Sequence, residues 1–162
     1  MELILDQLPQ NLDDLQILPY AKLDRPEYAA GLFVAAMCRY PEDPEAALQM
    51  VDFLKGPEPL TPYGRQFLQD RMEGADYLPR SFFHGARPDN NYTPDLPYRL
   101  LVTENPYSYQ NEGRAQLYIQ SGGADSPRPI EMRLKPSTGQ WFMVKEMLLS
   151  GIRIPVALDP WA

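Results

Sequence analysis

The spacing of apolar residues changes near position 97, and this change limits the possible folds more than any other feature. Upstream, apolar residues recur every three to four positions, as Ala47, Val51 and Leu54 do, which is the helical period. Downstream, segment 114–120 alternates apolar and polar residues, which is typical of a strand with one buried face. The sequence therefore predicts the α+β class, with N-terminal helices packed on a C-terminal antiparallel β-meander.

Capping residues and prolines mark the starts of the predicted helices. Asp43 and Thr61 each stand directly before a proline, the usual order of an N-cap and a first helical residue. Asp24 followed by Glu27 predicts a capping box at the start of an earlier helix. The predicted helices cover residues 11–15, 24–39, 43–56 and 61–74.

The apolar residues of these helices predict how they pack. The run 28–38 is apolar on nearly all sides, so we expect it to form the central buried helix. In the last helix, Phe67 and Leu68 are the residues expected to face inward.

The β part is predicted to contain four to five strands. Four alternating segments cover residues 98–103, 114–120, 130–135 and 141–148. In the last of them, Phe142 and Val144 are expected to face the helices and Met143 to face outward. A short fifth strand is expected at Ile152–Val156, and Pro155 would place it at an edge of the sheet because proline cannot donate a backbone hydrogen bond.

The chain is predicted to form one α+β domain, residues 1–162, in three parts. The helical part covers about 11–74 and the β part about 98–156. Between them, residues 75–97 form a proline-rich linker that also carries Phe82, Phe83 and Tyr92. Because aromatic residues favour burial, we expect this linker to be ordered and to pack around one end of the sheet.

Charge and composition exclude several kinds of function. The net charge is −7 without a run of lysine or arginine, so we expect no nucleic acid partner. One cysteine, Cys38, and one histidine, His84, cannot form a disulfide or a cysteine–histidine metal site. With no nucleotide-binding fingerprint either, we expect no metal and no cofactor. No leader or membrane-spanning run is present, so we expect a cytoplasmic protein without membrane contact.

Polar residues in and near the linker are the candidate ligand-binding residues. Arginine side chains suit carboxylate or phosphate groups, and a histidine titrates near neutral pH. The alternative is structural, with ion pairs for the arginines and turn formation for the Asp and Asn residues. No GxSxG motif is present, so we assign no catalytic residue. The candidates are Arg65, Arg80, His84, Arg87, Asp89 and Asn90.

Tyrosines on and between the first two strands of the meander form a second candidate site. Tyr118 lies on a predicted strand, and Tyr107 and Tyr109 lie in the loop before it. Exposed tyrosines suit a protein interaction surface because they add contact area at small entropic cost. Ordinary cross-strand packing is the alternative.

Three segments of the chain are similar to a known family. They read FLKGPEPLTPYGRQFLQDRM, YLPRSFFHGARPDNNYTPDLPY and WFMVKEMLLSGIRIP. Between Phe53 and Pro155 the chain resembles a family of small bacterial proteins, mainly from Firmicutes, that is a domain of unknown function. The resemblance implies a bacterial cytosolic source and an α+β domain, and it brings no reaction, ligand or catalytic residue.

Two functions remain open from the sequence. The first is a non-enzymatic cytosolic binding or protein-interaction domain, because no nucleophile, metal or cofactor motif is present. The alternative is a small-molecule-binding protein or hydrolase-like enzyme, with a pocket between helices and sheet near His84.

Overall fold

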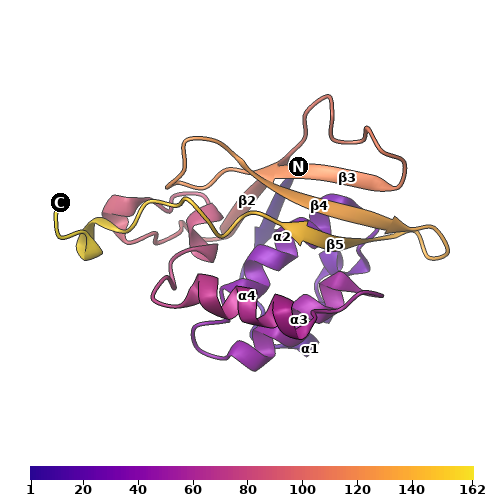
Figure 1. Ribbon diagram of the computed structural model, residues 1–162, viewed down its shortest axis with the longest axis horizontal. Coiled ribbons are helices and arrows are strands. Elements are labelled where there is room, and N and C mark those ends of the chain that lie inside the picture. The colour runs from indigo at the N-terminus through magenta and orange to yellow at the C-terminus, as the bar shows by residue number, and fades with distance from the viewer.

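The computed structural model describes residues 1–162 and confirms the predicted α+β class. The helices lie on one side of an antiparallel sheet with strand order β1-β2-β3-β4-β5 (Figure 1). The strands are β1 (Glu2–Leu5), β2 (Tyr98–Thr103), β3 (Arg114–Ile119), β4 (Arg128–Lys135) and β5 (Gln140–Glu146). The α-helices are α1 (Leu12–Gln16), α2 (Pro26–Met37), α3 (Pro44–Lys55) and α4 (Pro62–Met72). Four 3-10 helices complete the chain: η1 (Pro19–Lys22), η2 (Pro79–Phe82), η3 (Pro88–Asn90) and η4 (Val156–Leu158).

Helix α2 is the centre of the core, as predicted from its apolar run. Residues 29–37 are all buried, and the helix contacts α3 and strands β2 to β5. The predicted capping box of Asp24 and Glu27 is wrong. Proline favours the first helical position, and Pro26 therefore makes Arg25 the N-cap. Glu27 instead pairs with Arg25, with 3.4 Å between Nε and Oε2.

The two other predicted N-caps are confirmed. Asp43 accepts a hydrogen bond from Ala46 N at 3.1 Å, and Thr61 accepts one from Gly64 N at 3.0 Å. Each bond satisfies one of the backbone N–H groups that a helix start leaves free. The longest helices, α2 and α3, have 12 residues each, and no helix is long and apolar enough to cross a membrane.

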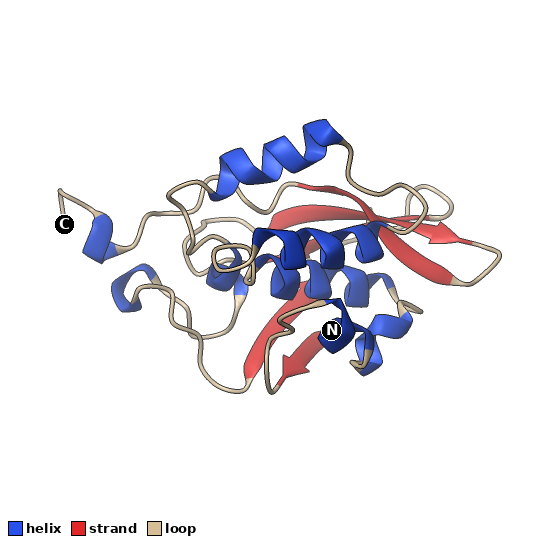
Figure 2. Ribbon diagram, turned by 90° about the horizontal axis from the view of Figure 1, so that it is seen from below, coloured by secondary structure: helices blue, strands red, loops and turns tan.

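Helix α4 packs less closely than the sequence predicts. It buries only Leu68 and Met72, and it lies apart from α2 and α3 in the view from the helical side (Figure 2). Phe67 was expected to face inward with Leu68, but it remains 36% exposed, and the Arg71 guanidinium lies 5.0 Å from its ring centroid. The expectation for Phe67 is therefore wrong, because α4 contacts the core along a narrow stripe.

The fifth strand is at the opposite end of the chain from the predicted one. Strand β1 pairs with β2 and buries Leu3 and Leu5. No strand forms at Ile152–Val156. There, Arg153 N donates to Gly123 O at 2.9 Å, so this segment packs against a loop instead of a strand edge.

The predicted faces of β5 are reversed in the structure. Met143 is the most buried residue of this strand, whereas Phe142 and Val144 are only partly buried. A β-bulge interrupts the pairing of β5 with β4 between Glu131 and Met132. Because apolar residues occupy both faces of this strand, alternation alone did not determine which face is buried.

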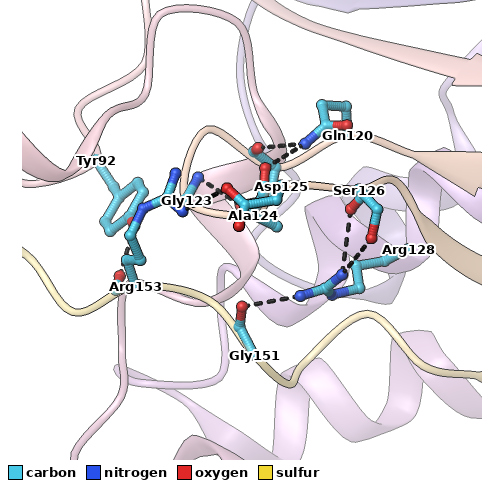
Figure 3. A network of polar contacts seen from close by, with 10 residues as sticks. Tyr92, Gln120, Gly123, Ala124, Asp125, Ser126, Arg128, Gly151 and Arg153 are labelled. Atoms are coloured by element: carbon cyan, nitrogen blue, oxygen red, sulfur yellow. Dashed lines mark hydrogen bonds and ion pairs between the residues drawn. The ribbon is translucent and has the colours of Figure 1, made fainter.

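The linker of residues 75–97 is ordered and fixed by the C-terminal segment. Tyr92 is fully buried and stacks on Tyr77, with 5.4 Å between ring centroids. The Tyr92 hydroxyl donates to the carbonyl oxygen of Arg153, whose side chain pairs with Asp125 at 2.8 Å (Figure 3). Three segments that are distant in sequence therefore meet at one end of the molecule.

Candidate functional site

Strand β5 is an edge of the sheet, and its backbone directs hydrogen-bonding groups away from β4; bonds within the chain already use those of Trp141 and Val144, which leaves Met143 between them. Trp141 N donates to Leu23 O at 2.7 Å, outside the sheet. Leu134 is the residue of β4 that lies opposite Trp141, and its N–H donates to Gly113 O, on the side of β4 away from β5. Backbone groups alternate in direction along a strand, so Met143, two residues after Trp141, also directs its N–H and C=O toward the free edge.

An apolar groove lies between this edge and helix α4. It has a volume of about 300 Å³. Tyr63 on its rim is 81% exposed, whereas other aromatic residues such as Phe33, Phe82 and Tyr92 are buried. We call this cavity the groove; its apolar lining is Phe33, Leu60, Tyr63, Phe67, Leu68, Met143 and Val144.

Asp52 positions the α4 wall of the groove. Its Oδ1 accepts a hydrogen bond from Leu60 N at 2.9 Å, and its Oδ2 accepts one from the Arg65 guanidinium at 3.1 Å. Arg65, a predicted ligand-binding residue, therefore ties α4 to α3. The ion pair with Asp52 gives Arg65 a structural role beside the groove.

Lys55 lies between the groove and a second cavity. Its Nζ donates to Val144 O at 3.4 Å, and burial lowers the pKa of its ammonium group. Lys55 and Val144 line both cavities. The second cavity has a volume of about 230 Å³ and also contains Arg133, Lys135 and Phe142. We call it the basic pocket.

Glu146 lines the groove but not the basic pocket. Burial raises the pKa of the Glu146 carboxyl group. Its Oε2 accepts a hydrogen bond from Leu148 N at 2.8 Å, which lowers the pKa and opposes part of that rise. The groove therefore contains the Glu146 carboxylate together with two lysines, Lys55 and Lys145.

Sequence reasoning missed the basic pocket because its cations come from different elements. Lys55 ends α3, whereas Arg133 and Lys135 are at the end of β4. No run of basic residues marks them. The sequence does show that Lys135 lies beside the turn between the last two alternating segments. It does not show that the end of α3, with Lys55, packs beside this turn.

The predicted binding residues of the linker lie together at the surface and mostly bind the linker itself. Arg80 donates to Asn91 O at 3.0 and 3.2 Å, and Arg87 pairs with Asp89 at 3.0 Å. The Asn90 side chain accepts from Arg87 N at 2.8 Å and donates to a backbone carbonyl. These contacts match the structural alternative for the residues.

His84 lies outside the cavities described above. Its side chain is 73% exposed, and its Nδ1 lies 3.2 Å from Asp95 Oδ2. The nearby Ser81 hydroxyl is buried and donates to Leu78 O at 2.7 Å. His84 lines neither the groove nor the basic pocket, and both of these cavities are lined by Lys55.

The candidate tyrosines divide between two environments. Tyr107 is exposed, and the Tyr118 hydroxyl accepts from the Gln116 side chain at 3.2 Å. Burial, with help from the Glu27 and Glu104 carboxylates, raises the pKa of Tyr109 to about 12. Tyr109 is 48% exposed and Tyr107 is 71% exposed, so both rings are available for contact.

Comparison with known proteins places the chain in a family. Residues 7–156 match the family described as a domain of unknown function, DUF6935. No curated protein and no solved structure matches the chain.

Proposed function

We propose that this chain, which belongs to the DUF6935 family, is a non-enzymatic domain that binds an extended segment of a partner protein in the groove beside β5. Strand addition to a free sheet edge is a common way to bind a peptide. The bound backbone pairs with the edge, and side-chain pockets supply specificity.

The observation that carries the proposal is a free edge facing an apolar wall. Met143 directs its backbone groups toward the edge, and Tyr63 and Phe67 on α4 are exposed beside it. A sheet edge usually carries protection against pairing with other chains. Here the charges at the edge are Lys55, Lys145 and Glu146, and the two lysines suit a partner with negative charge.

The partner is proposed to be a protein in the bacterial cytosol. The net charge of −7 supports a protein over a nucleic acid. A free cysteine, Cys38, is compatible with a reducing compartment. Fractionation of a source bacterium with an antibody against the chain tests the location, and recovery in the secreted fraction would contradict it.

Selection from a displayed peptide library tests the binding site. Peptides that bind the wild-type chain are expected to lose about tenfold or more in affinity for Tyr63→Ser and Phe67→Ser, because aromatic residues dominate many interfaces. Tyr107→Ser is the matched control, since Tyr107 is similarly exposed. If Tyr107→Ser alone weakens binding, the tyrosine loop is the interface and the groove proposal is wrong.

A further inference from the structure

We infer that the bound segment carries a carboxylate side chain, which enters the basic pocket and pairs with Lys55, Arg133 and Lys135. This inference rests on the proposed function and names the chemistry of the partner. It commits to a carboxylate of an Asp or Glu side chain in the partner protein.

The groove and the basic pocket adjoin at Lys55, whose bond to Val144 O lies between them. Lys55 and Val144 line both cavities. A segment that lies along β5 therefore passes Lys55 and reaches the basic pocket at the end of β4. The residues of that segment meet apolar side chains beside α4 and cations beside Arg133.

The protein already places one of its own carboxylates, Glu58, in the basic pocket. Glu58 Oε1 lies 3.5 Å from Arg133 Nη1. Both side chains are more than half exposed, and exposed ion pairs contribute little to stability. A partner carboxylate can therefore replace Glu58 at small cost.

The charges of the basic pocket also favour an incoming carboxylate. The basic pocket holds three cations and one carboxylate, in a chain with a net charge of −7. Burial already disfavours the charged form of Lys55, and an incoming anion would compensate for that cost. The basic pocket has the larger excess of cations over carboxylates, so the acidic residue is expected there.

Paired peptide pools test the inference. Two pools of synthetic eight-residue peptides, labelled with fluorescein, contain alternating Val and Thr and differ only in Glu or Gln at one end. Fluorescence anisotropy measures their binding to the wild-type chain. We expect the Glu pool to bind about tenfold more tightly, which equals about 1.4 kcal/mol.

Three variants locate the effect. Arg133→Gln is expected to remove the preference for Glu over Gln. Glu58→Gln removes the competing carboxylate and is expected to strengthen binding of the Glu pool several-fold. Arg99→Gln changes the net charge by the same amount as Arg133→Gln at an exposed position of β2, and it is expected to leave the preference intact.

The outcomes separate this inference from the proposed function. NMR spectra of the labelled chain show whether the peptides shift the backbone amide signals of β5. If both pools bind equally and shift these signals, the carboxylate inference is overturned and the groove proposal stands. A Glu preference that Arg99→Gln reduces as much as Arg133→Gln also overturns the inference, because general charge then explains it. Failure of both pools to bind at β5 overturns the proposed function and the inference together.

Discussion

Gly56 sets the distance between the end of α3 and strand β5. Its φ of 61° lies in the left-handed region that glycine adopts most readily. A Cβ at this position would overlap the Phe142 ring. This close approach brings Lys55, the residue before Gly56, to Val144 on β5.

Gly56→Ala is therefore expected to destabilise the fold by about 2–4 kcal/mol, from backbone strain plus overlap with Phe142. Gly74→Ala is the matched control. Gly74 has a φ of 67° but nothing within 4 Å of an added Cβ, so only strain of about 1 kcal/mol is expected. Urea unfolding measures both, and equal costs would contradict the proposed close approach.

Glu146 is expected to make stability depend on pH. Burial raises its pKa above the ordinary 4.5, so between 4.5 and the raised pKa the folded state binds more protons than the unfolded state. Stability therefore falls as pH rises through this window. Glu146→Gln should remove this part of the pH dependence.

Urea unfolding across the acidic pH range measures the effect of Glu146→Gln. The exposed Glu112 provides the control, because Glu112→Gln is expected to leave the slope unchanged. A slope that survives in Glu146→Gln would show that another group causes it.

At the scale of elements, α4 is the less buried wall of the site. It buries only Leu68 and Met72, and Asp52 joins it to α3. Elements with few buried contacts open at low free energy. The groove can therefore widen by displacement of α4 while the sheet stays fixed.

Asp52→Ala is expected to increase amide hydrogen exchange across residues 62–72 by about tenfold, because it removes two hydrogen bonds to that region. Global stability should fall by about 1–2 kcal/mol. Asp70→Ala, which removes only a bond to Gln66 within α4, is the control. Unchanged exchange in α4 of Asp52→Ala would show that packing alone holds the helix.

The elements also show which features the sequence could predict. The caps at Asp43 and Thr61 were predictable because they depend on residues close in sequence. Strand β1 was not, because its four residues pair with β2 about a hundred positions later. The buried face of β5 depended on the bulge opposite Met132 in β4, which no local pattern indicates.

The site was less predictable than the fold. Arginines and Asx residues of the linker were recognisable as polar groups in a stiff segment, but their partners proved to be the linker itself. The groove arises from the meeting of α3, α4 and β5. The cations of the basic pocket, Lys55, Arg133 and Lys135, are separated in sequence and become neighbours only in the folded chain.

At the scale of the whole molecule, the linker and the C-terminal segment hold the end opposite the groove. Tyr92→Phe removes the hydroxyl that donates to Arg153 O, and we expect a loss of about 1–2 kcal/mol because that carbonyl loses its partner. Tyr77→Phe is the control, since it keeps the stacked ring pair. Thermal or urea unfolding compares them, and an equal effect of both changes would contradict a specific role for the Tyr92 hydroxyl.

The molecule has two parts, an end fixed by the linker and an edge proposed to bind a partner. The linker residues that looked most like a site stabilise the fixed end, whereas β5 and α4 form the open edge (Figures 1 and 2). Substitutions at His84 or Arg87 are therefore expected to leave peptide binding unchanged.

The most direct test is an intermolecular NOE spectrum of the isotopically labelled chain with a selected peptide. Strand addition predicts NOEs between backbone protons of the peptide and the amide proton of Met143, accompanied by contacts to the Tyr63 and Phe67 rings. A peptide that binds but shows NOEs only to residues 80–94 or to the loop containing Tyr107 would contradict the account.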